Sequence, residues 1–312
     1  MSTPDPGASV LRAEQGSGPA ADRASPPPTT DDWAPSPRQR ERDRARRRAT
    51  RRSAVVAGVS TVAFALVVGF GITRTSGWPR VRESFFNLEA GRQALPDVAR
   101  GLLLNLRVLA VCAVVVVVLG MLLAVARTTR SPVTLPLRIL AAAWTDLFRG
   151  LPLILVLLLV GFGVPGLRLS GVPTSAVFLG GVALTLTYSA YVGEVFRAGI
   201  ESVHPSQRAA ARSLGLGYGA TLRFVVLPQA VRRVTAPLLN DLVSLQKDSG
   251  LISVLGGIDA VRAAQIQTAQ TANFTAYVVA GALFVALTIP VTRLTDALAA
   301  RSARRQAAGG GL

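Results

Sequence analysis

Long uncharged apolar segments constrain this 312-residue chain more than any other feature. Residues 54–72 form one such segment, and comparable segments recur along the rest of the chain. A helix of about 20 residues crosses a hydrocarbon core of about 30 Å, because each residue adds about 1.5 Å. Every backbone polar group must be satisfied inside that core, which favours helices. The sequence therefore predicts an all-α, polytopic membrane helical bundle and excludes an ordinary soluble enzyme.

Six transmembrane helices are predicted, and the fifth is the weakest because it contains several polar and charged residues. The predicted spans are residues 54–72, 101–126, 136–164, 174–193, 235–256 and 273–292. The segment 73–100 mixes charged residues with apolar residues at helical spacing. This pattern predicts a short amphipathic helix lying at the outer membrane surface.

The N-terminal region is polar and then strongly basic. Residues 1–37 are rich in Pro, Ser, Ala, Asp and Thr and lack apolar periodicity, which predicts disorder. Residues 38–52 contain nine arginines. A cleaved signal peptide at 54–72 is an alternative, but the preceding polar residues, 1–53, are far longer than a normal n-region.

The positive charges are distributed asymmetrically between the two sides of the predicted membrane. The formal net charge is +17, and Lys247 is the only lysine among 34 basic residues. With the N-terminus in the cytoplasm and six alternating spans, 25 of the 34 fall in cytoplasmic segments. The positive-inside rule therefore predicts a multi-pass protein of the cell membrane with both termini in the cytoplasm. The arginine block then serves orientation and contact with anionic lipid, without nucleic acid.

Residues for common enzymatic chemistry are scarce. Cys112 and His204 are the only cysteine and histidine, so we expect no disulfide, Cys-based metal site or Ser-His-Asp set. A phosphate loop for ATP requires GxxxxGK followed by Ser or Thr, and the sequence GLGYG at 215–219 has no such continuation. We therefore expect no catalytic residue, no metal and no cofactor bound by this chain.

The stretch 194–228 is too long for a simple connection between spans. Two short helices are predicted, at about 205–214 and 218–225, with Leu227–Pro228 ending the second because proline cannot continue a helix. The bend between them is rich in glycine and contains Gly215, Gly217 and Gly219. Together these two helices and the bend are predicted to form a compact knob within 194–228. The knob is predicted to project into the cytoplasm as a docking surface, with three exposed arginines, Arg208, Arg212 and Arg223.

Four motifs occur in an order that resembles ABC importer permeases of the polar amino-acid type, which import histidine, glutamine, glutamate or arginine. Phe-Arg-Gly-x-Pro-Leu lies at 148–153, and Glu-x-x-Arg-x-Gly-Ile-x-Ser-Val lies at 194–203. The loop signature, Ala-Ala-x3-Gly-x9-Val-x-Leu-Pro, spans 210–228, and the last run, which contains Lys-Asp-Ser, spans 237–249. The resemblance covers about residues 98–300.

The resemblance implies the non-catalytic membrane subunit of a binding-protein-dependent importer that works by ATP-driven alternating access. Residues 98–296 would be its five-helix permease domain with a coupling loop at 200–228, residues 54–97 an added helix with its external segment, and 1–53 and 297–312 cytoplasmic tails. The implied partners are two ABC ATPase subunits that hold ATP and Mg, an identical or different second permease, and an extracytoplasmic amino-acid-binding protein. No nucleic-acid partner is expected.

The resemblance also assigns site residues. Coupling to the ATPase is expected from Gln207, Arg208, Ala209, Ala210, Ala211, Arg212, Gly215, Leu227 and Pro228. Ala209 stands where the family usually has Glu, so this one acidic contact with the ATPase is not expected here, while docking as a whole still is. The substrate path is expected at Asn240, Lys247 and Asp248, with mutual pairing of Lys247 and Asp248 as the alternative. Arg149, Glu194 and Arg197 are expected to form a structural ion pair.

Two other functions are alternatives. A stand-alone secondary transporter or channel requires inverted repeats and an ionisable group at mid-membrane, for which Asp241 is the available residue. A membrane-anchored nucleic-acid-binding protein would use residues 38–52, but it leaves the later spans and the 194–228 stretch unexplained.

Overall fold

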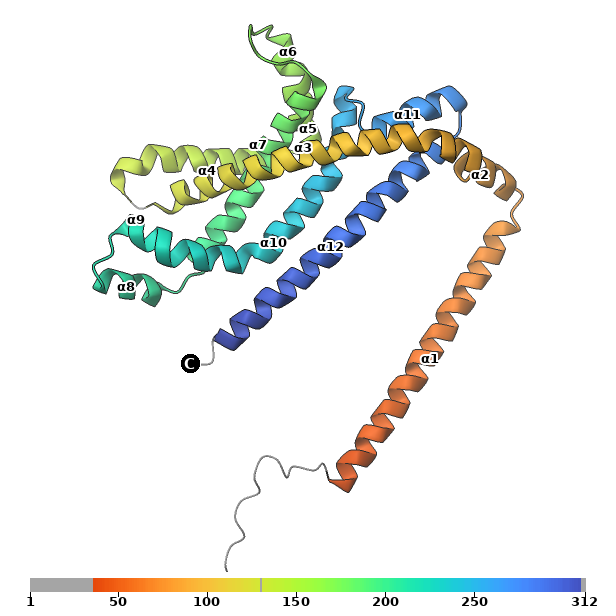
Figure 1. Ribbon diagram of the computed structural model, residues 1–312, viewed down its shortest axis with the longest axis horizontal. Coiled ribbons are helices and arrows are strands. Elements are labelled where there is room, and N and C mark those ends of the chain that lie inside the picture. Colours follow the sequence, from red (N-terminus) through yellow and green to blue (C-terminus); the bar gives the residue numbers. More distant parts are fainter. Residues whose placement is uncertain (1–35, 130, 310–312) are drawn as a thin grey trace, which may run out of the picture. The chain divides into compact units, whose positions relative to one another are not determined.

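The computed structural model describes residues 36–129 and 131–309, and its regular elements are helices, which confirms the all-α prediction (Figure 1). The predicted disorder of residues 1–35 lies outside the described residues. In chain order the elements are α1 (Pro37–Thr73), α2 (Trp78–Phe85), α3 (Leu88–Thr128), the 3-10 turn η2 (Pro132–Thr134), α4 (Leu135–Gly150), α5 (Leu153–Leu158), the π-helical turn η3 (Leu159–Gly163), α6 (Val164–Gly166), α7 (Ala176–Glu201), α8 (Pro205–Ser213), α9 (Tyr218–Thr221), the π-helical turn η4 (Leu222–Val226), α10 (Leu227–Asp248), the 3-10 segment η5 (Ser249–Leu255), α11 (Ala260–Thr271) and α12 (Thr275–Gly309).

The chain divides into two compact units at Arg74–Thr75. The first contains α1, which joins the basic block and the first predicted span in one continuous helix. The Ser36 side chain accepts a hydrogen bond from the Gln39 N–H, and Pro37 occupies the first turn, so this helix has a regular N-terminal cap. The apolar side chains of α1 are exposed along its whole span, as expected of a helix that faces lipid.

Four helical stretches of the described residues are long and apolar enough to cross a membrane: Thr50–Thr73, Trp78–Thr128, Ala176–Glu201 and Thr275–Leu298. A fifth is added if the bent pair Pro132–Gly150 and Leu153–Gly166 counts as one span. The predicted count of six is therefore not confirmed. The predicted fifth span, 235–256, falls in α10, which is too polar to qualify as a span, and in η5, which is only seven residues long.

Two predicted segments need correction. Residues 136–164 do not form one straight span, because the chain bends by 107° between α4 and α5. Leu151 adopts an extended conformation there (ψ 138°), since the following Pro152 disfavours the helical region for it. The segment 73–100 is not one short helix: α2 ends at Phe85, and from Leu88 the chain already belongs to α3, whose start is capped by the Asn87 side chain.

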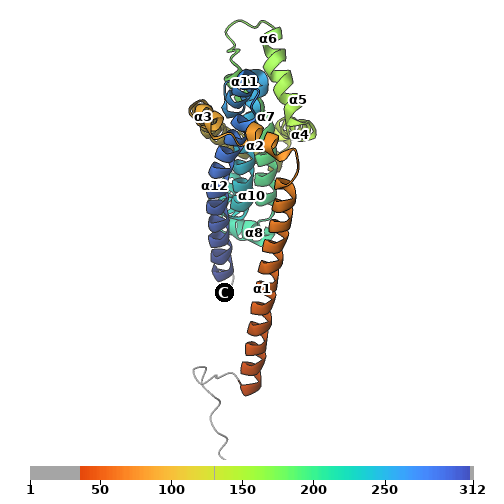
Figure 2. The same ribbon diagram turned by 90° about the vertical axis from the view of Figure 1, so that its right-hand side faces the viewer.

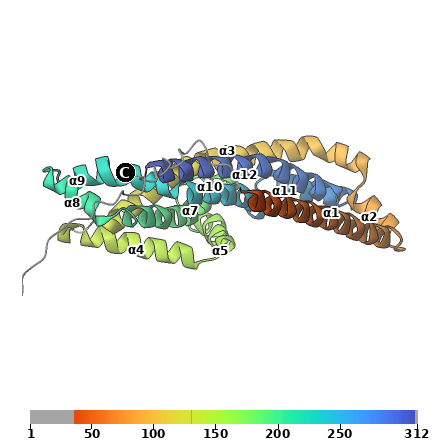
Figure 3. The ribbon, with the colours of Figure 1, turned by 90° about the horizontal axis from the view of Figure 1, so that it is seen from below.

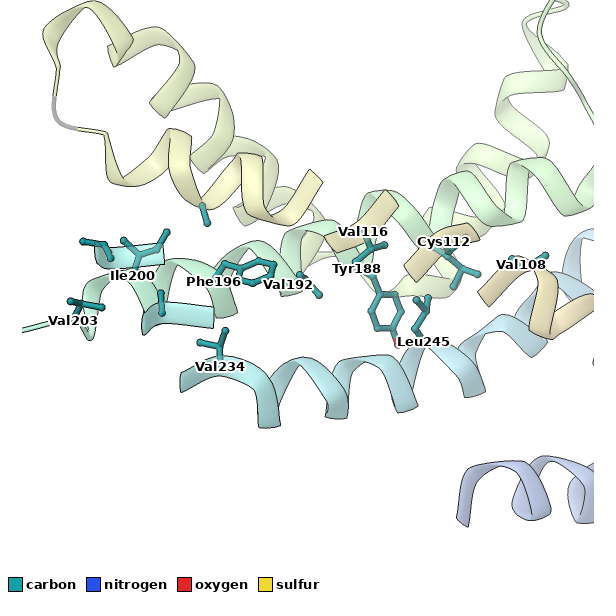
Figure 4. Packing of buried hydrophobic residues seen from close by; sticks show 14 of the residues in the cluster. Val108, Cys112, Val116, Tyr188, Val192, Phe196, Ile200, Val203, Val234 and Leu245 are labelled. Atoms are coloured by element: carbon teal, nitrogen blue, oxygen red, sulfur yellow. The ribbon is translucent and has the colours of Figure 1, made fainter. Parts of the chain in front are cut away.

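The second unit is built around α3, α7 and α10. Buried residues recur every three or four positions along α3, at Ala94, Val98, Gly101, Asn105, Val108, Cys112, Val116, Gly120 and Ala124. This spacing forms one stripe along the helix. Figure 4 shows its central part facing Tyr188 and Val192 of α7 and Leu245 of α10. Near its N-terminal end, the same stripe packs against small alanines of α11 and α12.

Glycines allow the backbones of this unit to approach closely. A Cβ atom at Gly120 would lie 2.7 Å from Val192 Cγ1, and one at Gly101 would lie 2.4 Å from the Asp259 carbonyl carbon. Next to Gly101, the buried Asn105 amide donates to the Ser249 carbonyl at 2.9 Å, and its oxygen accepts from the Ala260 N–H at 3.1 Å. A buried polar side chain thus fastens η5 and the start of α11 to α3.

The second unit has two distinct ends. Figures 1 and 3 agree that α8 and α9 lie at one end and that α2 and α11 lie at the other. At the latter end, the Phe274 N–H donates to the Ser84 carbonyl at 2.8 Å, and the rings of Phe85 and Phe274 stack. Figure 2 shows α4 and α12 on opposite sides of α10. The stretch 202–226, which contains α8 and α9, therefore lies at one end of the second unit.

We predict that Gly101→Ala destabilises the protein by about 1–3 kcal/mol, because the added methyl group meets backbone atoms that cannot move aside. Gly281→Ala on α12 is the control, since no atom lies within 4 Å of its Cβ position and alanine favours a helix. Thermal unfolding of the purified full chain, followed by tryptophan fluorescence, measures both variants. Equal midpoints for the two variants would contradict the close approach.

Candidate functional site

The loop between α7 and α10 is ordered by local hydrogen bonds. His204 caps α8, because its Nδ1 accepts from the Ser206 N–H, and Pro205 occupies the first turn. At the other end Gly215 adopts a left-handed conformation with φ +80°. The Gly215 N–H donates to the Arg212 carbonyl, and the Leu216 N–H donates to the Ala211 carbonyl. These two bonds form a Schellman motif, which ends α8 and turns the chain back.

The predicted bend is therefore correct at Gly215 and Gly217, which both lie between α8 and α9. Gly217 has φ −63° and caps α9, while Gly219 lies inside α9. The prediction that Leu227–Pro228 ends the second helix is wrong, because both residues begin α10. The π-helical turn η4 joins α9 to α10, and Pro228 lies in the first turn of α10, where its missing N–H costs no helical hydrogen bond.

The residues expected to couple to a partner divide into exposed and buried groups. Exposed residues of α8 and its surroundings are Gln207, Ala209, Ala210, Arg212, Gly215 and Pro228. Ala211 is buried and Leu227 is half-buried. The prediction that Arg208 is exposed is wrong: it is half-buried, because its guanidinium donates to the Ile200 carbonyl. Arg223 is exposed, as predicted.

Sequence reasoning missed two apolar residues of the loop. The Leu214 residue is 82% exposed and Phe224 is 66% exposed, with Arg223 stacked on the Phe224 ring. The available signal for an exposed leucine was its position: Leu214 directly precedes Gly215, the glycine that ends α8. Arg212 in the last turn of α8 and Leu214, which caps that helix, form the loop tip, a cationic and apolar exposed end of α8.

Glu194 is the centre of an ion-pair cluster at the same end. Its carboxylate lies 2.8 Å from Arg127 Nη1 of α3 and 3.8 Å from Arg149 Nη1 of α4. Arg197, one turn further along α7, binds both oxygens of Glu194 and also contacts Glu201. The three residues predicted to pair, Arg149, Glu194 and Arg197, thus lie together, and Arg127 joins them from α3.

The residues expected on the substrate path lie on α10 but do not form one cluster. Asn240 and Lys247 are exposed, and among the described residues no ion pair involves Lys247. Asp248 is half-buried and accepts a hydrogen bond from the Tyr188 hydroxyl at 2.6 Å, rather than pairing with Lys247. Tyr188 was missed because a tyrosine inside an apolar run reads as a core residue.

Comparisons with known proteins agree with this architecture. The family model described as "Binding-protein-dependent transport system inner membrane component" matches residues 116–306, which include the 194–228 stretch. The arginine transport system permease protein ArtQ of Bacillus subtilis is 32% identical over 205 residues, covering 65% of this chain and 91% of that protein. The probable glutamine ABC transporter permease protein GlnM of Bacillus subtilis is 38% identical over 178 residues, covering 56% and 79%.

A solved transporter structure is also similar to this chain. The crystal structure of an amino acid ABC transporter with histidines matches with a TM-score of 0.60 and 30% identity. The match covers 66% of this chain and 94% of that one. About a third of this chain therefore lies outside the part shared with that transporter.

We predict that Gly215→Val opens the loop, because L-residues disfavour positive φ by about 1–2 kcal/mol and β-branched residues do so most. Gly217→Val is the matched control, since Gly217 has negative φ and open space around its Cβ position. Trypsin cleavage of the purified chain after Arg212 and Arg223 should be about tenfold faster in Gly215→Val. The same cleavage rate in both variants would contradict a required left-handed residue.

Proposed function

Because the chain belongs to the family of binding-protein-dependent transport system inner membrane components, we propose that it is the permease subunit of an ATP-driven importer of polar amino acids. It is a multi-pass membrane protein and a transport component. The observation that carries the proposal is the match of the family model across the 194–228 stretch, which here is an ordered knob at one end of the unit.

In this proposal the energy source is a separate chain. Two cytoplasmic ABC ATPase subunits, which hold ATP and Mg, bind the knobs of two permeases, identical or different. The loop tip offers an apolar side chain, Leu214, and a cation, Arg212, on an otherwise ordered surface. Ala209 stands where the family usually has an acidic side chain that contacts the ATPase. In this chain the apolar loop tip takes the place of that charged contact.

The proposed substrate class is that of polar amino acids, delivered by an extracytoplasmic binding protein. The relatives' names, arginine and glutamine permeases, support this class. Asn240, Lys247 and Asp248 on α10 supply an amide, a cation and a carboxylate. The cation and the carboxylate complement the two charges of a zwitterion, and the amide can form hydrogen bonds with it. Polar groups inside a membrane are costly unless they face a cavity or a ligand.

The orientation follows from the charge distribution. With residues 235–256 as a sixth crossing, both termini and the 200–228 loop lie in the cytoplasm, and 25 of the 34 basic residues then face inward. The α2–α11 end, opposite the loop, faces the binding protein.

The direct test is reconstitution. The chain is placed in proteoliposomes with a candidate ABC ATPase, a candidate second permease and a candidate binding protein from the same organism, and uptake of labelled arginine, glutamine, glutamate and histidine is measured with and without ATP. We expect uptake of at least one amino acid that requires both ATP and the binding protein. Uptake by the purified chain alone, driven by an ion gradient, would establish a secondary transporter instead.

We predict that Leu214→Asp reduces co-purification of the ATPase at least tenfold, because burying an unpaired carboxylate in an apolar groove is costly. Arg212→Glu should weaken it less, since exposed ion pairs contribute about 0–1 kcal/mol. Arg100→Glu on α3 is the control, because this exposed arginine lies some 28 residues from the loop end of its helix. Unchanged co-purification of Leu214→Asp would remove the loop tip from the interface.

A further inference from the structure

Side chains of the loop bind the carboxyl-terminal ends of two core helices. The Tyr218 hydroxyl, at the start of α9, donates to the carbonyl of Thr128, the last residue of α3, at 3.1 Å. The Arg208 guanidinium of α8 donates to the Ile200 carbonyl near the end of α7. Arg233 of α10 donates to the carbonyl of Ser202, the residue that caps α7, and to its hydroxyl at 3.2 Å.

These contacts follow from the chemistry of helix ends. The last four carbonyls of an α-helix lack N–H partners within the helix, and cations are favourable beside them because of the helix dipole. Here the partners come from three different parts of the loop region: α8, α9 and α10. The loop is therefore attached to α7 through Arg208 and to α3 through Tyr218, while Arg233 attaches the start of α10 to the end of α7.

The two helix ends are also attached to each other. Arg127, the residue before Thr128 on α3, reaches Glu194 of α7 at 2.8 Å. Both side chains are only about one fifth exposed, at 18% and 22%, so solvent screens this pair less than a surface pair. Arg197 holds the other oxygen of Glu194, which keeps the carboxylate in place.

An apolar layer fills the space between the loop and α7. Val203 and Val226 are almost fully buried, and both pack in the same cluster as Ile200 and Ala230. Figure 4 shows Ile200 and Val203 at the end of the buried row that continues through Phe196 and Val192. Packed layers of this kind transmit displacement because they have little free volume.

We propose that the loop 205–226, the start of α10 and the ends of α3 and α7 form one rigid block, in which Tyr218, Arg208 and Arg233 are positioning residues. The proposed function supplies the force, since an ATPase that moves α8 then moves both helix ends with it. The block itself is a property of this chain alone. Beyond it, α3 and α7 stay in contact through Gly120 and Gly193, so the displacement continues into the membrane-spanning part.

A distance measurement tests the block directly. Cys112 is the only native cysteine and is buried, so in a Cys112→Ala background two spin labels can be placed at Ser213→Cys on α8 and Leu122→Cys on α3, two exposed positions outside the expected ATPase contacts. We expect one narrow distance distribution that is the same without nucleotide and with ATP and the ATPase bound. Tyr218→Phe should broaden it, while Tyr277→Phe, an exposed tyrosine of α12, should not.

A distance that shifts on ATP binding in the unmodified block, or a distribution that stays narrow in Tyr218→Phe, would overturn the proposal. The width in the purified chain is measurable without an ATPase. Failure of the proposed function would therefore appear as absent ATP-dependent uptake, and failure of the block as an unaltered width.

The coupling ratio is the second measurement. In the reconstituted complex, we expect Tyr218→Phe to carry about fivefold fewer substrate molecules per ATP hydrolysed, the factor that corresponds to loss of one hydrogen bond. Tyr277→Phe should keep the unmodified ratio. A Tyr218→Phe complex in which transport and ATP hydrolysis fall by the same factor would place Tyr218 in docking rather than transmission, which also overturns the proposal.

Discussion

The direct contact between the backbones of α3 and α7 is the constraint on which the second unit depends. Gly120 and Gly193 face each other, and a Cβ atom at Gly120 would lie only 2.7 Å from Val192. In lipid no hydrophobic force drives helices together, so close packing and interhelical hydrogen bonds must hold them. The buried stripe of α3 then continues past α7 to α10 and, near its other end, to α11 and α12. One helix thereby organises the rest of the unit.

Polar contacts complement this packing at two places along α3. Near the α11 end, Asn105 is almost fully buried and bonds to Ser249 and to the start of α11. Near the loop end, Arg127 bonds to Glu194. Leaving the Asn105 amide or the Glu194 carboxylate without a partner would cost free energy of folding. Each of these two groups therefore specifies one arrangement of its neighbours. The apolar stripe between them supplies the area, and these contacts determine the axial register of α3.

Much of this architecture could be predicted from periodicity and apolar length alone. The spans near α3, α7 and α12, the knob between α7 and α10, and the need for glycine at 215 all follow from local rules. What could not be predicted depends on three-dimensional context. Proline at 152 breaks a helix, whereas proline at 228 begins one, because a π-helical turn precedes it. Arg208 looks like a solvated residue of a polar loop, and only the end of α7 explains why it turns inward.

The π-helical turn η4 has a consequence for how the knob is aimed. A π turn contains about one residue more than an α turn, and each residue of an α-helix rotates the chain by about 100°. Loss of a single residue from Leu222–Val226 could restore ordinary α geometry without breaking the helix, yet α8 would then face a different direction. The angular setting of the knob relative to α10 is thus encoded in the length of five residues rather than in their chemistry. A chain that keeps this length, with an apolar residue at the buried position of Val226, would still present the same face to a partner.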